Sequence, residues 1–169
     1  MTNANDNAPD ASTEFGAVVV GAGFAGMYML HKLRGLGLRV RVVEAGGSVG
    51  GTWYWNRYPG ARVDTETMFY SYQFSNELQQ EWEWSERYPS QGELHGYAKH
   101  VADRFELWPD IQFDSPVEKA TWDEATRRWT IETADGTQLI SQYCVMATGC
   151  LSSVNTPKFK GLENFVGPV

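Results

Sequence analysis

One segment of the sequence, from Gly50 to Asp64, combines aromatic rings and fixed charges in an order that suits neither a helix nor a strand. It reads GGTWYWNRYPGARVD. Tyr58-Pro59-Gly60 would break any regular element. A solvent loop would not expose Trp53, Tyr54, Trp55 and Tyr58 so close together, because that much aromatic surface invites aggregation. We therefore interpret the segment as an irregular wall folded around a flat, apolar ligand.

The residues before this segment have the pattern of a dinucleotide-binding turn. Gly21-Ala22-Gly23-Phe24-Ala25-Gly26 follows a continuous apolar run over 15–20 and precedes helical spacing of leucines. The first glycine permits a tight turn, the second lets the backbone approach a pyrophosphate, and the third lets helix and strand pack closely. The N-terminus of the helix then offers unpaired N–H groups to the phosphates.

Glu44 indicates which dinucleotide is bound. It ends a second predicted strand, over 39–43, where a carboxylate can bind both hydroxyls of an adenosine ribose. An acid there disfavours a 2′-phosphate, which leaves FAD or NAD. FAD is favoured because the chain continues into the irregular segment instead of another helix and strand. In that segment Thr52 offers a hydroxyl and a backbone N–H, and Trp53 and Trp55 offer stacking faces.

The aromatic segment matches a fingerprint of type I Baeyer–Villiger monooxygenases, which are class B flavoprotein monooxygenases. The matching pattern is Gly51-x-Trp53-x4-Tyr58-Pro59-Gly60-x3-Asp64. This segment and EWEWSERYPSQ over 81–91 resemble the phenylacetone and steroid monooxygenase branch, and the resemblance spans about 15–169. It implies an enzyme that uses FAD, NADPH and O2 to convert ketones to esters or lactones through a C4a-peroxyflavin.

The resemblance also implies roles for individual residues. Asp64 would be catalytic by holding and polarising an active-site arginine; the alternative is a loop carboxylate that caps a helix starting near Thr65. Tyr70 would face the flavin, or it is simply a core tyrosine. Val117 would meet the adenine through its backbone. The complete set expected to contact FAD is Gly21, Gly23, Phe24, Ala25, Gly26, Glu44, Gly51, Thr52, Trp53, Trp55, Tyr58, Asp64, Tyr70, Val117, Ala147, Thr148 and Gly149.

These elements predict an α/β fold: a truncated Rossmann-like FAD-binding domain, with a parallel sheet and a three-stranded antiparallel meander. The meander strands are expected over about 117–122, 128–133 and 137–140, followed by a separate, final buried strand over 143–146. A helix is expected after a capping box at Ser90 and Glu93, with Leu94 and Tyr97 on its buried face.

The domain division expected from the sequence is a disordered tail over 1–14 and the N-terminal part of an FAD-binding domain over 15–169. Phe165-x-Gly167 begins a signature of the same family whose histidine and tryptophan do not follow, and no second G-x-G-x-x-G occurs. We therefore expect the NADPH domain and the remainder to be absent, and the isolated chain to be inactive. Two alternatives remain: a flavin-containing or N-hydroxylating monooxygenase, and a non-catalytic FAD-binding fragment.

The amino-acid composition excludes some classes of binding partner. A net charge of −7 over 169 residues argues against nucleic acid and anionic membranes. The expected partners are a ketone, O2 and the missing C-terminal part of the same enzyme. No metal site is expected, since His95 and His100 do not share a helix face. Residues 1–14 lack an apolar leader, and Cys144 and Cys150 suit free thiols, so we expect a cytoplasmic location.

Overall fold

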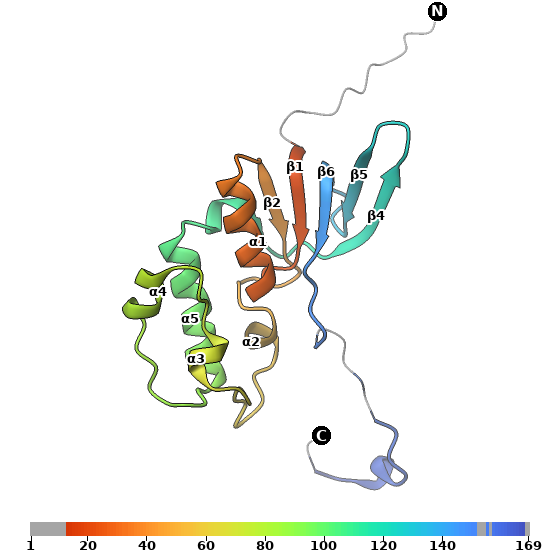
Figure 1. Ribbon diagram of the computed structural model, residues 1–169. Coiled ribbons are helices and arrows are strands. Elements are labelled where there is room, and N and C mark those ends of the chain that lie inside the picture. Colours follow the sequence, from red (N-terminus) through yellow and green to blue (C-terminus); the bar gives the residue numbers. More distant parts are fainter. Residues whose placement is uncertain (1–12, 152–154, 156, 168–169) are drawn as a thin grey trace, which may run out of the picture.

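The computed structural model describes residues 13–151, 155 and 157–167. Its centre is a six-stranded mixed sheet, with α1 and α5 on one side and a β-hairpin at one edge (Figure 1). The elements are β1 Glu14–Val20, α1 Phe24–Gly35, β2 Val40–Val43, α2 Thr52–Trp55, α3 Thr67–Tyr70, α4 Asn76–Glu81, α5 Gln91–Arg104, η1 Trp108–Asp110, β3 Ile111–Gln112, β4 Val117–Asp123, β5 Arg128–Thr133, β6 Gln138–Met146 and η2 Leu162–Asn164.

The strand order β3-β2-β1-β6-β5-β4 divides the sheet into two halves. β3, β2, β1 and β6 are parallel, whereas β6, β5 and β4 form the antiparallel meander. The apolar run of β1 sits between β2 and β6, and its residues 17–19 are fully buried, as expected of a strand covered on both faces. The predicted α/β architecture with a meander is therefore confirmed.

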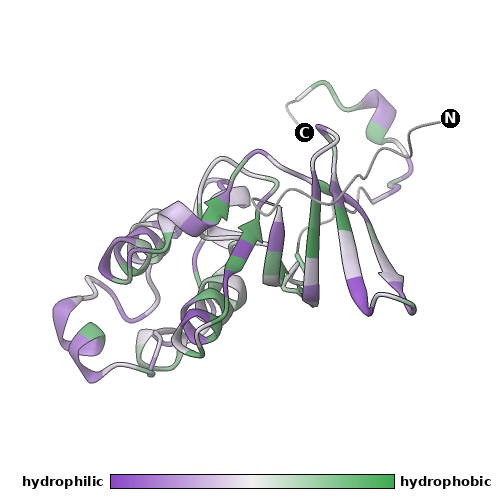
Figure 2. Cartoon of the chain, turned by 90° about the horizontal axis from the view of Figure 1, so that it is seen from above, coloured by the Kyte–Doolittle hydropathy of each residue, from purple (hydrophilic) through white to green (hydrophobic). Residues whose placement is uncertain are grey.

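Two hydrophobic clusters hold the two faces of the sheet. On one face Met27 and Leu30 of α1 pack with Val19 and Val42, together with Ala98 of α5. On the other face Ile131 and Leu139 of the meander pack in one cluster with residues of β1 and β2: Phe15, Val18, Val20 and Val43. Figure 2 shows hydrophobic residues on the central strands and hydrophilic ones on outward-facing helix turns.

The prediction of two separate strands near the end of the sheet was wrong. A single strand, β6, completes the meander through β5 and also pairs in parallel with β1. Ser141, which lies between the two predicted strands, is opposite Trp129 on one side and Phe15 on the other. The strand is not buried throughout either, because Tyr143 and Met146 are 51% and 62% exposed.

Two further boundaries differ from expectation. β1 begins at Glu14, which the sequence assigned to the tail, and residues 1–12 lie outside the described part of the chain. The helix predicted after Ser90 is α5, and its buried residues include Leu94 and Tyr97 as predicted. The capping box was wrong, because Ser90 makes no side-chain cap and Glu93 instead accepts hydrogen bonds from Ser85.

No helix in the described ranges is long and apolar enough to cross a membrane. The same residues contain no group of three His, Cys, Asp or Glu side chains placed to bind a metal ion.

Candidate functional site

A cavity of about 570 Å³ opens at the carboxyl ends of three adjacent parallel strands. Val20, Val43 and Met146, which end β1, β2 and β6, all line it. In open α/β sheets the loops that follow the strands at this edge are where ligands bind. The sheet topology therefore brings the glycine turn, the end of β2 and the end of β6 to one place.

The glycine turn after β1 is crowded against the end of β6. Gly21 has φ +102°, and a Cβ there would lie 2.6 Å from the carbonyl oxygen of Ala147. At Gly26 a Cβ would overlap the carbonyl oxygen of Gly21, so the third glycine permits the close helix packing that the motif predicts. Gly21, Gly23, Phe24 and Ala25 line the cavity, whereas Gly26 lies behind them.

Glu44 is buried, with 5% of its surface exposed, and lines the cavity. Its carboxylate accepts hydrogen bonds from the backbone N–H of Ala22 at 2.6 Å and of Gly46 at 2.8 Å. The side chain thus braces the glycine turn against the loop after β2. Because each carboxylate oxygen can accept more than one hydrogen bond, Glu44 can still bind hydroxyl groups of a ligand.

The aromatic segment forms the opposite wall and is tied to the glycine turn. The N–H of Gly50 donates to the carbonyl oxygen of Ala22 at 3.0 Å. Gly51 has φ +53°, and a Cβ there would lie 2.8 Å from the Cα of Gly23. Thr52, Trp53 and Trp55 then line the cavity from the single turn of α2, a regular turn where the sequence predicted none.

Three aromatic residues of the segment have different environments. Trp53 is 7% exposed and packs with Val63 and Leu94, as expected of a buried wall. Trp55 lines the cavity although it is 53% exposed. Tyr58 is 63% exposed and does not line the cavity, so the structure does not support its predicted contact with FAD.

Trp53 and Tyr70 form a hydrogen-bonded pair at one side of the cavity. The indole Nε1–H of Trp53 donates to the hydroxyl oxygen of Tyr70 at 2.9 Å. Phe24 packs against Tyr70 with the ring centroids 5.4 Å apart. Burial raises the pKa of the Tyr70 phenol, the hydrogen bond from Trp53 opposes that rise, and the negative charge of Asp64 adds to it. Tyr70 therefore lies within electrostatic reach of Asp64.

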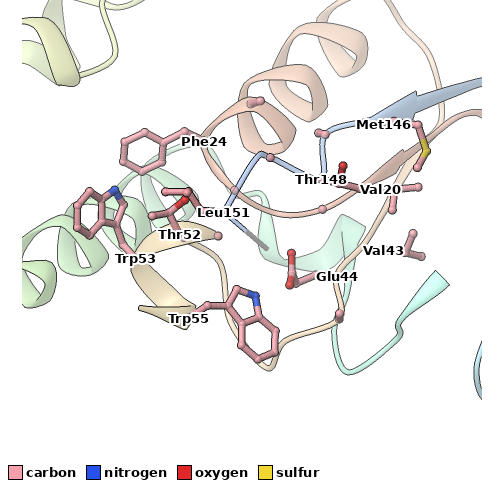
Figure 3. A pocket seen from close by; sticks show the side chains of 18 of the residues that line it. Val20, Phe24, Val43, Glu44, Thr52, Trp53, Trp55, Met146, Thr148 and Leu151 are labelled. Carbon is pink, nitrogen blue, oxygen red and sulfur yellow. The ribbon is translucent and has the colours of Figure 1, made fainter. Parts of the chain in front are cut away.

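The two walls have different chemistry. Figure 3 shows Phe24 and Trp53 on one side of the cavity and Glu44 and Val43 on the other. The carboxylate of Glu44 offers a polar contact at one side, and the rings of Phe24 and Trp53 offer apolar surfaces at the other. An elongated ligand with a hydroxyl-bearing end and a flat end would match this arrangement.

Asp64 lies outside the cavity lining, on an exposed loop. The hydroxyl of Thr65 donates a hydrogen bond to the carboxylate of Asp64 at 3.4 Å. No residue in the described part of the chain forms an ion pair with Asp64. The alternative of a helix cap is wrong, because α3 begins at Thr67 with Glu66 at its N-cap position. Asp64 is thus an exposed carboxylate whose charge acts on the Tyr70 phenol.

The loop that carries Asp64 is fastened on both sides to the segment before α5. The guanidinium of Arg62 binds the carboxylate of Glu86 at 2.5 and 3.2 Å, and Arg87 forms an ion pair with Glu66. The N–H of Val63 also donates to the carbonyl oxygen of Pro89. We call residues 61–67 the Asp64 strap.

Several lining residues were not predicted from the sequence. The sequence could have identified Val43 and Gly50, since they are next to predicted site residues in the chain. Ser115 had none: it reaches the cavity because its N–H donates to the carbonyl oxygen of Glu44 at 2.9 Å. The lining residues absent from the prediction are Val20, Val43, Ala45, Gly50, Ser115, Pro116, Met146 and Leu151. The predicted residues Val117, Ala147, Thr148 and Gly149 are among the lining.

The two histidines of α5, His95 and His100, are half-buried. The ring of His95 packs edge-on against Tyr54, with centroids 5.9 Å apart, and burial lowers the pKa of its imidazole. The ring of His100 packs against Trp82 at 5.2 Å. Each histidine therefore has its own aromatic partner.

Comparison with known proteins places this geometry in a family. Residues 18–167 match the family described as pyridine nucleotide-disulphide oxidoreductase. The chain belongs to that family. A solved structure titled oxidized steroid monooxygenase bound to NADP superposes with a TM-score of 0.85 and 54% sequence identity, over 92% of this chain and 30% of that one.

Two curated relatives cover nearly all of the chain. A phenazine N-monooxygenase of Lysobacter antibioticus is 46% identical over 93% of this chain and 29% of its own length. A Baeyer-Villiger monooxygenase of Pseudooceanicola batsensis is 42% identical over 100% of this chain and 31% of its own length. The predicted resemblance to Baeyer–Villiger monooxygenases is confirmed, and this chain spans about a third of the length of these relatives.

The cavity residues fit FAD. The backbone at Gly21 and Gly23 is bare where a pyrophosphate would approach, at the N-terminus of α1. Glu44 lines the same cavity with a carboxylate suited to ribose hydroxyls, and Trp53 with Tyr70 provides aromatic surface beside which an isoalloxazine ring could lie. These lining residues thus suit, in turn, the ribose, the pyrophosphate and the ring system of FAD.

Proposed function

We propose that this chain is the FAD-binding N-terminal part of an NADPH- and O2-dependent Baeyer–Villiger monooxygenase that converts ketones to esters or lactones. The observation that carries the proposal is the single cavity that joins the glycine turn, Glu44 and the Trp53–Tyr70 pair. The match of the whole segment Gly51–Asp64 to the fingerprint of these enzymes supports it. When bound, FAD would supply the redox chemistry that activates oxygen.

The residues of this chain would hold and orient the flavin. The N–H groups at the start of α1 would bind the pyrophosphate, and Glu44 would bind the adenosine ribose. Val117, Ala147, Thr148 and Gly149 line the cavity, and we propose that they contact FAD through their backbones. Trp53 and Tyr70 would border the ring system and keep water away from one of its faces.

We propose that Asp64 acts on the reaction through a cation from outside this chain. It is exposed, and within the described ranges it forms no ion pair, so its carboxylate is available to an arginine. A carboxylate beside an arginine would orient the guanidinium and keep it charged next to a developing oxyanion. Tyr70, whose pKa is raised by burial and further by the charge of Asp64, would lie between this ion pair and the flavin.

The proposed activity also defines the co-substrates and the cellular location that we expect. NADPH, O2 and the ketone would be the co-substrates, and we propose that NADPH binds mostly through residues beyond this chain. The free thiols of Cys144 and Cys150 suit a reducing compartment, which supports the proposed cytoplasmic location.

Two measurements test the proposal. The purified chain should bind FAD, seen as quenching of flavin fluorescence, but should not oxidise NADPH in the presence of a ketone. The complete protein that contains this chain should form an ester or lactone from a cyclic or aryl ketone. Failure of the chain to bind FAD, or ester formation by the 169-residue chain alone, would contradict the proposal.

N-oxygenation is a second candidate. The relative with 46% identity is a phenazine N-monooxygenase, whereas the Baeyer-Villiger relative has 42%. These similar values show that the FAD-binding part is alike in enzymes with different substrates. We propose to incubate the complete protein with a phenazine and with a ketone in parallel. N-oxide formation without any ester would favour the second candidate.

A further inference from the structure

The Trp53–Tyr70 pair has one hydrogen-bond donor with no partner in the described part of the chain. A tyrosine hydroxyl has one proton to donate and can also accept. The indole N–H of Trp53 is donated to the Tyr70 oxygen at 2.9 Å. Among the described residues none accepts the proton of Tyr70, although the residue lines the cavity. The acceptor would therefore come from a molecule in the cavity.

The direction of the Tyr70 proton is restricted by Trp53. A phenolic O–H lies close to the plane of its ring, which leaves two orientations about the C–O bond. The indole hydrogen occupies the space on its own side of the oxygen, so a proton turned that way would meet another hydrogen. The two ring planes are 78° apart with centroids 5.9 Å apart, an edge-on contact that holds this arrangement.

Trp53 itself is held firmly enough to impose that direction. It is 7% exposed and packs against Val63 and Leu94. The side chain of Gln91, the first residue of α5, donates to the carbonyl oxygen of Trp53. Phe24 supports the other ring of the pair. The pair is thus fixed from α1, α3 and α5, while Trp55, on the same turn, is 53% exposed.

We propose that Trp53 is a positioning residue that turns the Tyr70 hydroxyl proton toward a hydrogen-bond acceptor on the flavin half of FAD. This inference rests on the proposed function. The flavin half is assigned because Trp53 and Phe24 lie across the cavity from Glu44, the proposed ribose ligand (Figure 3). Trp53 therefore contributes to binding through Tyr70 as well as through its ring surface.

A double-mutant cycle tests this, with FAD and ADP as probes. ADP retains the adenosine and pyrophosphate but lacks the flavin half. Tyr70→Phe should weaken FAD binding by roughly three- to tenfold, the factor for one hydrogen bond, and leave ADP binding unchanged. Trp53→Phe keeps an aromatic ring without the N–H and should also weaken FAD alone. In the Tyr70→Phe background, Trp53→Phe should cost much less, because its effect passes through the hydroxyl.

Trp55→Phe is the matched control. Trp55 lines the same cavity, and its indole N–H has no hydrogen bond in the described ranges, so its effect should be the same with Tyr70 and with Phe at position 70. Equal costs of Trp53→Phe in both backgrounds, or equal losses of FAD and ADP, would overturn the inference. Far-UV circular dichroism identifies a variant that fails to fold, and Trp53→Tyr then replaces Trp53→Phe in the cycle. If the unsubstituted chain binds ADP but not FAD, the proposed function fails instead.

Discussion

The side chain of Glu44 has two roles: it stabilises the fold, and we propose that it binds FAD. Its buried carboxylate accepts two backbone N–H bonds, from Ala22 in the glycine turn and from Gly46 after β2. Sequence spacing identified the position but only as a ribose ligand. The role in the fold depends on two loops meeting in space, which no local pattern describes. The same residue thus preorganises the turn that would bind the pyrophosphate.

Glu44→Ala should therefore destabilise the chain even without ligand. The substitution leaves the N–H groups of Ala22 and Gly46 without acceptors, and buried unpaired donors cost about 1–3 kcal/mol. Urea unfolding of the ligand-free chain measures this loss. FAD affinity should fall by a further ~1–3 kcal/mol. Glu44→Gln, which retains one acceptor, should lose less stability than Glu44→Ala. An unchanged unfolding free energy in Glu44→Ala would contradict the bracing role.

At the scale of structural elements, the Asp64 strap sets the position of the proposed catalytic carboxylate. Residues 61–67 have almost no regular structure, so tertiary bonds fix their path. Ala61 accepts a hydrogen bond from the N–H of Gln91, and Thr67 donates to the carbonyl oxygen of Arg87. The Arg62–Glu86 pair is exposed, so salt screens its charges.

Glu86→Gln should loosen the strap without unfolding the chain. The substitution removes the charge that Arg62 binds at two points, while Arg62 keeps its bond to the carbonyl oxygen of Tyr88. Amide hydrogen exchange at Val63 and Thr67 should become faster, and the melting temperature should change little. High salt should give the same increase in the unsubstituted chain. Glu118→Gln, on the distant strand β4, is the matched control. Unchanged exchange in Glu86→Gln would show that the backbone bonds alone hold the strap.

The sequence predicted those elements whose signal is local. Apolar runs, glycine spacing and helical periodicity were enough for β1, α1, β2 and the buried face of α5. β6 was predicted as two strands, over 137–140 and 143–146, although β1 and β5 pair with one continuous strand on either side. The capping box failed because Glu93 has a partner eight residues away, at Ser85. These errors share one cause: the deciding contact comes from elsewhere in the chain.

At the scale of the whole molecule, the helical side is held together by aromatic residues, whereas the sheet core is aliphatic. Tyr72 is central to this layer. Its hydroxyl donates to the carbonyl oxygen of Phe24, and its N–H donates to the hydroxyl of Tyr97 at 3.0 Å. Phe74 packs edge-on against Tyr72, with centroids 5.2 Å apart. The layer connects α1 to α5 and so fixes the distance between the glycine turn and the aromatic wall.

Buried hydroxyls in this layer make the stability of the chain sensitive to alkaline pH. Burial raises the pKa of Tyr70, Tyr72 and Tyr97. The unfolded chain releases these protons near pH ~10, whereas the folded chain retains them. The stabilisation is therefore complete below pH ~10. It is lost progressively above that pH, since the folded state then binds more protons than the unfolded state.

The free energy of unfolding should thus fall steeply above pH ~10. Tyr72→Phe removes one of the titrating groups and should flatten the fall by at most about 1.4 kcal/mol per pH unit, the value for one proton. Urea titrations at several pH values give both slopes. The lost hydrogen bond to Phe24 lowers the whole curve of the variant, so only the slope is diagnostic. An equal slope in the variant and the unsubstituted chain would show that Tyr72 ionises alike in both states, which contradicts its place in a closed aromatic layer.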